Sequence, residues 1–221
     1  MSFSGYLMPP QSHPSPAFQL CAGHAALDLV NSLDDRFAER APAERLTDYG
    51  ALLAFAVQAD LLDARLARQL ARTAPAVAER VLRAVRELRE ALAGALYAHV
   101  GGRVMPAADL RALERHFARA TRHRELRWRG SRERGSLGWD FGRFAQRAEL
   151  PLWLLALSAT DLMTSESLAR VSSCGADSCR WLFLDTSRNH TRRWCDMKVC
   201  GNRMKARRFQ ARHEAHVPHR Q

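Results

Sequence analysis

A long amphipathic pattern occupies the middle of the chain. Between residues 74 and 100, apolar side chains recur in steps of four, four, three, four and four residues. The stripe consists of Val77, Val81, Val85, Leu88, Leu92 and Leu96. Such spacing places the apolar residues on one face of an α-helix, and Gly101-Gly102 is a stop signal. The sequence therefore predicts a long helix over 74–100 with one side against a core.

Shorter apolar patterns predict further helices. These are expected over 46–62, 106–120 and 148–168. In the first, Thr47 or Asp48 lies near the N-cap position. In the second, Leu110, Leu113 and Phe117 should face inward. The third, residues 148–168, is almost wholly apolar, so we expect it at the centre of the core.

The remaining patterns complete the predicted organisation. Residues 21–33 fit either a buried strand or the start of a helix. "ELRWR" and "LGWDF" flank "GSRERGS", which predicts a β-hairpin. The fold class is thus a mainly α N-terminal domain with a small β-hairpin, followed by a small cysteine-rich module. The expected divisions are a flexible leader (1–18), a helical domain (19–169), the module (170–216) and a tail (217–221).

Positive charge is concentrated at the C-terminal end. The chain has 221 residues and a formal net charge of +11. Residues 170–221 carry twelve Lys/Arg and four Asp/Glu, a net of +8, which leaves +3 for residues 1–169. This asymmetry favours an anionic partner, nucleic acid before membrane.

Neither a secretory signal nor a membrane segment is visible. The first twenty residues are rich in Pro and Ser and lack an apolar core. The longest apolar run, "LPLWLLAL" (150–157), is far shorter than a membrane span. We therefore expect a cytoplasmic protein, nucleoid-associated when bound to DNA, whose thiols stay reduced.

Four of the five cysteines form two pairs of equal spacing. Cys174, Cys179, Cys195 and Cys200 give the pattern C-x4-C-x15-C-x4-C. Four thiolates suit one structural Zn²⁺ in a closed tetrahedral site. Structural disulfides, redox chemistry and an iron–sulfur site are the alternatives, and a reducing compartment disfavours the first.

The residues around the cysteines predict a treble-clef or zinc-ribbon-like module. Residues 180–185 alternate like a strand, 186–190 form a turn, and 191–195 return as the second strand. Asn202 would then cap a C-terminal helix. The histidines that could compete as zinc ligands are His190, His213, His216 and His219. Cys21 is interpreted as a small buried apolar residue.

This region resembles a known family. The pattern CxxxxCxxLFxDxSRNxxRRWCxMxxCGNRxK is that of the CGNR zinc finger, and the name-giving tetrapeptide here is residues 200–203. Proteins of that family carry an N-terminal ABATE domain that opens like G-x-x-ALDLVNT. The chain matches this opening from Gly23 to Asn31, with Ser32 in place of Thr. The resemblance implies a bacterial, stress-linked transcription regulator with a zinc-bearing, DNA-binding C-terminus.

The basic residues of the module are the candidate DNA contacts. They are Arg188, Asn189, Arg192, Arg193, Lys198, Arg203, Lys205, Arg207, Arg208 and Arg212. Arginine suits phosphate and guanine edges, and asparagine suits adenine. A solvated basic face and a protein partner remain as alternatives. Asp185 and Asp196 would pair with Arg188 and Arg192 in a purely structural interpretation.

Aromatic residues of the module also have two interpretations. Trp181, Phe183 and Trp194 fit a small core better than base-stacking platforms.

In the N-terminal domain, Asp28, Asn31 and Arg36 form a candidate effector pocket. In the simpler interpretation, the first two cap local structure and Arg36 forms a salt bridge. No phosphate loop, nucleophile elbow or catalytic metal motif is visible, so we do not expect an enzyme.

Three functions are therefore compared. The leading hypothesis is a DNA-binding regulator with an effector-sensing or dimerisation domain. A homodimer would carry two zinc modules and so bind DNA more tightly. The second is a zinc-containing protein-interaction module that does not bind DNA. The third is a small-molecule enzyme with its pocket in residues 20–165.

Overall fold

A computed structural model describes residues 18–38, 41–130 and 134–214, apart from the side chains of Arg208 and residues 211–214. The α-helices among them are α1 (Ala25–Asn31), α2 (Tyr49–Gln58), α3 (Ala64–Leu70), α4 (Pro75–Val100), α5 (Ala107–Arg122), α6 (Leu150–Met163) and α7 (Asn202–Glu214). The strands pair as three separate antiparallel hairpins: β1 (Leu33–Asp34) with β2 (Ala43–Glu44), β3 (Glu125–Gly130) with β4 (Gly135–Asp140), and β5 (Val171–Ser173) with β6 (Leu182–Leu184). The mainly helical fold class is confirmed.

Helix α4 is the longest element and matches its prediction. It begins with Pro75 in its first turn and ends at Val100, before Gly101. The predicted stripe is buried from Val81 to Leu96, whereas Val77 is half-buried. Gly102, with φ of 63°, then takes a left-handed turn that L-residues avoid. Because the repeat matches the helical period, the buried face follows directly from the sequence.

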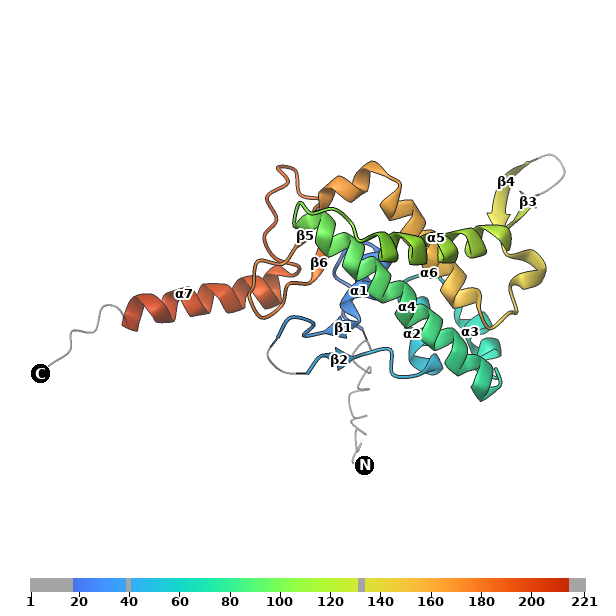
Figure 1. The fold of residues 1–221 in the computed structure, drawn as a ribbon, viewed down its shortest axis with the longest axis horizontal. Coiled ribbons are helices and arrows are strands. Elements are labelled where there is room, and N and C mark those ends of the chain that lie inside the picture. Colours follow the sequence, from blue (N-terminus) through green and yellow to red (C-terminus); the bar gives the residue numbers. More distant parts are fainter. Residues whose placement is uncertain (1–17, 39–40, 131–133, 215–221) are drawn as a thin grey trace, which may run out of the picture.

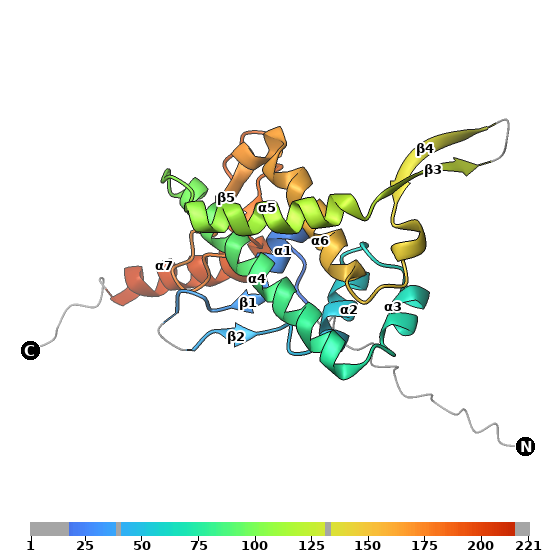
Figure 2. The same ribbon diagram turned by 45° about the vertical axis from the view of Figure 1, so that its right-hand side comes forward.

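Helices α1, α2, α5 and α6 pack around α4 to make the core (Figures 1 and 2). Helix α6 is central, as predicted, with Leu155, Ala156 and Ala159 fully buried. Within residues 21–33, Ala25–Asn31 form helix α1, whereas Leu33 begins strand β1. The N-cap of α1 is His24, whose Nδ1 accepts a hydrogen bond from the Ala26 amide at 3.2 Å.

Two details of the helical domain differ from the sequence-based expectation. Leu110 does not face inward, because the buried side of α5 runs through Ala112, Leu113 and His116 and leaves Leu110 43% exposed. Phe18, expected in the leader, is buried and packs edge-on against Phe55, with ring centroids 5.1 Å apart. The rest of the predicted leader, and the predicted tail at 217–221, lie outside the described residues.

The β3–β4 hairpin and α7 extend from opposite ends of the molecule (Figures 1 and 2). Helix α5 leads directly into the hairpin, which the sequence predicted. Helix α7 continues from a π-helical turn at Met197–Gly201 and packs mainly against that turn. Among the described residues, no helix combines the length and the apolar character needed to cross a membrane.

The hairpin of the cysteine-rich module has a different second strand from the one predicted. Residues 182–184 do form a strand, but they pair with Val171–Ser173 instead of 191–195. The first cysteine pair therefore lies in the loop between β5 and β6. Residues 191–194 have no regular secondary structure. The alternation of apolar residues predicted the strand at 182–184 correctly. Its partner strand was predicted wrongly, because it precedes the first cysteine and does not follow the turn.

Candidate metal centre

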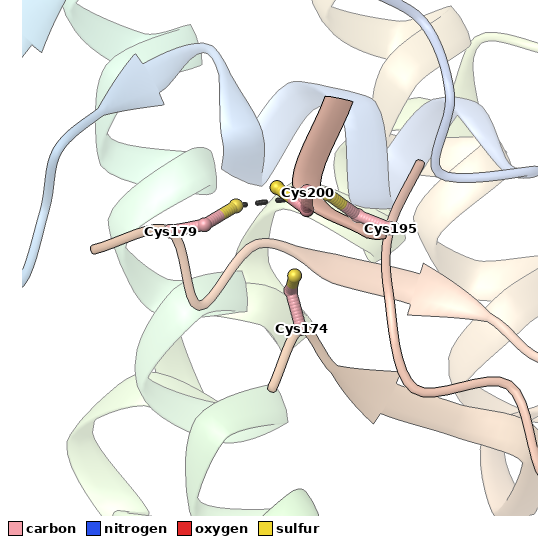
Figure 3. A group of neighbouring side chains, drawn as sticks. All are labelled: Cys174, Cys179, Cys195 and Cys200. Carbon is pink, nitrogen blue, oxygen red and sulfur yellow. Dashed lines mark hydrogen bonds between the residues drawn. The ribbon is translucent and has the colours of Figure 1, made fainter. Parts of the chain in front are cut away.

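The four predicted cysteine ligands converge on one point (Figure 3). Their sulfur atoms all lie within 4.8 Å of one another, and all four thiols are free of disulfides. The Sγ atoms of Cys179 and Cys195 are 3.6 Å apart, and those of Cys195 and Cys200 are 3.7 Å apart. Four sulfurs about 2.3 Å from a tetrahedral Zn²⁺ are about 3.8 Å from each other. The arrangement therefore fits a zinc tetrathiolate.

The first cysteine loop is closed by backbone hydrogen bonds. The Cys179 amide donates to the Ala176 carbonyl at 2.8 Å, and the Cys174 amide donates to the Trp181 carbonyl at 2.8 Å. The Gly175 amide donates to the Arg193 carbonyl, also at 2.8 Å, which ties the two cysteine loops together. A Cβ at Gly175 would lie 3.3 Å from that carbonyl oxygen, so this close approach favours glycine.

The second loop is ordered by Asp196. Its carboxylate accepts hydrogen bonds from the Lys198 amide at 2.6 Å and the Val199 amide at 3.2 Å. Asp196 therefore caps the π-helical turn, six residues before the predicted cap Asn202, which is the first residue of α7. Asn202 instead donates from Nδ2 to the Lys198 carbonyl at 3.1 Å. Arg203 Nη2 donates to Cys200 Sγ at 3.3 Å, which places a cation against one of the four sulfurs.

The close sulfurs shift one another's pKa values in opposite directions. The hydrogen bond to Cys174 is the largest cause that raises the pKa of both Cys179 and Cys195. Hydrogen bonds from Cys179 and Cys195 in turn lower the pKa of Cys174. Without a positive ion, sulfurs this close cannot all be thiolates, because their charges repel. A Zn²⁺ held by the four cysteines would supply that charge.

Of the competing histidines, only His190 has a described side chain, and it does not join the set. His190 is exposed and has a left-handed backbone with φ of 49°. His213, His216 and His219 have no described side chains. Cys21 is half-buried and packs against the cysteine cluster, where a hydrogen bond with Cys195 lowers its pKa. This neighbour of the site was missed because 153 residues separate Cys21 from Cys174 in the sequence.

Arg192 was predicted to contact DNA, but its guanidinium faces inward. Its Nε donates to the Trp194 carbonyl at 2.9 Å, and its Nη2 donates to the carbonyls of Cys21 and Cys195. Its guanidinium carbon also lies 4.6 Å from the centre of the buried Phe183 ring. Arg192 therefore joins the backbone at Cys21 to the second cysteine loop. Its guanidinium is not available to phosphate.

The two aspartates do not pair with arginines as the structural interpretation supposed. Asp185 accepts hydrogen bonds from the Ser187 hydroxyl and from the amides of Ser187 and Arg192. The hydrogen bond from the Ser187 hydroxyl is the largest cause that lowers the pKa of Asp185. The aromatic residues follow the core interpretation: Phe183 is fully buried, and Trp181 and Trp194 are half-buried beside the cysteines.

The other predicted DNA contacts lie on the surface around the cysteines. Exposed side chains are those of Arg188, Asn189, Arg193, Lys198, Arg203, Lys205 and Arg207. Arg208 and Arg212 belong to α7, but their side chains lie outside the description. Arg203, Lys205 and Arg207 lie on α7, which projects from the molecule. Most of the predicted positive surface is therefore at the α7 end of the molecule.

The three candidate effector residues have separate structural partners. Asp28 is buried, and its Oδ1 accepts the Ala22 amide at 3.0 Å. Burial raises the pKa of Asp28 to about 6. Asn31 exchanges two hydrogen bonds with the Leu182 backbone. Asp28 and Asn31 both line one cavity of about 230 Å³, whereas Arg36 does not line it and pairs with Glu90 instead.

Comparison with known families agrees with this two-part organisation. A family model described as "Putative stress-induced transcription regulator" (ABATE) matches residues 23–166. A second, described as "CGNR zinc finger", matches residues 170–213. No curated protein matches the chain. Since the first match alone covers more than half of the sequence, the chain belongs to the ABATE family and carries a C-terminal CGNR zinc finger.

Proposed function

We propose that this protein regulates transcription by binding DNA through its zinc module, with α7 as the element that enters the groove. The observation that carries the proposal is a basic helix, α7, that projects from the cluster of four cysteines (Figure 1). Thirteen helical residues span about 20 Å, and the major groove admits one α-helix. The cysteine loops fix the direction of this helix relative to the domain.

The charges around that helix match a phosphate backbone. The described, exposed cations are Arg188, Arg193, Lys198, Arg203, Lys205 and Arg207. If each neutralises one phosphate, the logarithm of the affinity should fall with the logarithm of salt concentration with a slope of about −5. Asn189, beside Arg188, is exposed and would contact base edges or phosphate.

The zinc ion would be held by all four cysteines and would cross-link the two loops. Such a closed site leaves no open coordination position, so its role is structural. The chain's own residues then do the work of recognition. Asp196 starts the helical segment, Arg192 fixes the second loop to the backbone at Cys21, and the exposed cations would meet the DNA.

The salt dependence of DNA binding tests the proposal. Fluorescence anisotropy with labelled duplexes from a genomic pool should give the slope of about −5. A triple variant, Lys198→Gln, Lys205→Gln and Arg207→Gln, should lower its magnitude by about 3. The matched control changes the exposed residues Arg65 and Arg68 of α3, and Arg72 just after it, to Gln and should alter neither slope nor affinity.

Two results would contradict DNA binding. One is the absence of any complex at low salt, and the other is an equal loss in the α3 control. Either would favour the alternative, a zinc-built protein-interaction module. The slope distinguishes these functions because a protein partner has no condensed counterion atmosphere to release.

The proposal assigns modulation of DNA binding to the helical domain, acting in the cytoplasm. Asn31 of α1 is bonded to β6, so a ligand or subunit that moves α1 also moves the strand beside the cysteine loops. The cavity of about 230 Å³ between Asp28, Asn31 and Trp181 is the candidate effector site. It has room for a small polar molecule only.

A further inference from the structure

The cavity beside α1 contains one carboxylate that no described cation offsets. Asp28 lines this cavity of about 230 Å³, although only 7% of the residue is exposed. Its Oδ1 accepts the Ala22 amide at 3.0 Å, and an ionised carboxylate can accept about four hydrogen bonds. Among the described residues, no Lys, Arg or His side chain is close enough to shift the pKa of Asp28. The carboxylate therefore has acceptor capacity and charge left over.

A buried charge of this kind calls for a bound cation. Burial raises the pKa of Asp28 to about 6, so the side chain is mostly ionised at neutral pH. An ionised group that is removed from water is costly unless it is paired. A cation in the cavity would offset this cost, because it would place the missing charge beside Asp28.

Three other polar side chains of the cavity already have partners. Asp34 Oδ2 pairs with Arg45 at 3.4 Å, and Asp34 Oδ1 accepts the Trp181 indole N–H at 3.0 Å. Asn31 uses its side-chain amide on the backbone of Leu182. Two carboxylates and one guanidinium line the cavity, so their formal charges sum to −1. The unmatched charge belongs to Asp28, which favours a monocation as the ligand.

Apolar side chains complete the wall and limit the size of the ligand. Phe18, Leu20 and Trp181 line the same cavity as Asp28. A volume of about 230 Å³ equals that of roughly seven water molecules at about 30 Å³ each. Divalent metal ions prefer several oxygen ligands, which one unpaired carboxylate beside apolar walls does not provide. The wall instead suits an organic cation with a short apolar chain, and Trp181 can add a cation–π attraction.

We propose that the cavity binds a small organic monocation of the primary-ammonium class, whose charged head contacts Asp28 and whose apolar chain lies against Phe18 and Trp181. The inference rests on the proposed function, because it names the chemical class of effector for the site assigned there. An ammonium group donates three hydrogen bonds, and Asp28 supplies a charged acceptor for it. Arg45, which also lines the cavity, would repel a second positive group, so a single charge is favoured.

The cavity lies between α1 and the zinc module. Asp28 and Asn31 are about one turn apart on α1, and Asn31 bonds the Leu182 backbone of β6. Trp181, which also lines the cavity, accepts the Cys174 amide at its carbonyl oxygen, 2.8 Å away. A ligand that contacts Asp28 and Trp181 would therefore connect α1 to the first cysteine loop. This gives a small effector a route to the zinc module.

Titration of the zinc-loaded, full-length chain with propylammonium chloride, at an ionic strength held constant by KCl, tests the proposal. Two-dimensional ¹H–¹⁵N NMR follows the Trp181 indole N–H, whose signal is assigned with a Trp181→Phe variant. We expect a saturable shift with a Kd of roughly 0.1–1 mM, since four non-hydrogen atoms set a modest limit on affinity. 1-Propanol has the same size but no charge, so it should bind at least about tenfold more weakly. An indole signal that stays in place, or that propanol moves with equal affinity, overturns the proposal.

Three variants identify the charge that the ligand carries. Asp28→Asn keeps an acceptor for the Ala22 amide but removes the charge, so the affinity for propylammonium should fall about 30-fold or more. The matched control, Glu79→Gln, removes an exposed carboxylate of α4 and should leave the affinity unchanged. Arg45→Gln removes the guanidinium from the cavity wall and should bind propylammonium at least as tightly as the wild type.

Two results with these variants would also overturn the proposal. One is wild-type affinity in Asp28→Asn. The other is loss of propylammonium binding in Arg45→Gln together with a shift of the wild-type Trp181 signal by sodium propionate, which would make the site one for anions. Circular dichroism checks that each variant is folded, and the comparison of propylammonium with propanol on the wild-type chain needs no variant.

The outcome is distinguishable from that of the DNA-binding experiment, because the titration contains no DNA. If propylammonium does not bind, the protein can still show the salt slope of about −5. If DNA does not bind, the NMR titration still measures whether the cavity takes a cation.

Discussion

Asn31 provides the sharpest test of how the zinc module is attached to the helical domain. Its Nδ2 donates to the Leu182 carbonyl at 2.8 Å, and its Oδ1 accepts the Leu182 amide at 3.0 Å, both in a buried position. Asn31→Ala leaves both backbone groups without a partner. Each buried, unsatisfied group costs about 1–3 kcal/mol, so for two groups we expect a loss of about 2–6 kcal/mol in the free energy of unfolding. That is a large part of the stability of a typical domain.

Urea unfolding of the zinc-loaded protein, followed by far-UV circular dichroism, measures this loss. Zinc release to a chromophoric chelator should also become faster, because β6 adjoins the first cysteine loop. Asn31→Asp keeps the acceptor but directs a negative charge at the Leu182 carbonyl, so it should destabilise at least as much as alanine.

The matched control is Asn202→Ala. Asn202 also donates to a backbone carbonyl, but it is exposed, and its loss should cost less than about 1 kcal/mol. An Asn31→Ala protein within 1 kcal/mol of wild type, or a control with an equal loss, would refute the reasoning that buried bonds to β6 attach the module.

Two further predictions concern single side chains near the site. Burial raises the pKa of Asp28 from 3.8 to about 6. The folding stability that its proton confers is therefore complete below pH 3.8 and is lost as the pH rises through 6. This loss in the free energy of unfolding amounts to about 3 kcal/mol. Asp28→Asn retains the acceptor for the Ala22 amide and should gain stability relative to wild type between pH 4 and 7, whereas parallel thermal-melting profiles would contradict this. Cys21→Ser should keep one metal per chain and an unchanged cobalt spectrum, while Cys179→Ser should alter the spectrum; a changed spectrum in the first variant would make Cys21 a ligand.

What the sequence could predict was decided mainly by the range of the interactions. The periodicity of α4 is local, and so is the spacing of ligands on each cysteine loop, so both were predictable. Helix α3 was not predicted, because only Ala67 and Leu70 of its seven residues are buried. Helix α1 was ambiguous because it is buried on nearly all sides, which removes the contrast that separates helix from strand.

The roles of polar side chains were harder to predict. Arg192 and Arg193 are neighbours of the same type, yet one faces the cysteine loops and the other is exposed. Their sequence contains no signal that separates them. Asn31 was assigned to an effector pocket because a polar group in an apolar run needs a partner. That partner is the Leu182 backbone, 151 residues away, which no local pattern reveals.

The contacts between the helical domain and the zinc finger indicate that metal binding and helical packing are coupled. Leu182 of the zinc finger is fully buried in the core of the helical domain. The Leu184 amide donates to the Ala22 carbonyl at 2.7 Å, and the Trp181 indole donates to Asp34 at 3.0 Å. A change in the cysteine loops must therefore disturb contacts on both sides of α1. Since reciprocal binding effects follow from any such coupling, a ligand or subunit that alters α1 should change the zinc affinity, and zinc should change the affinity for that ligand by the same factor.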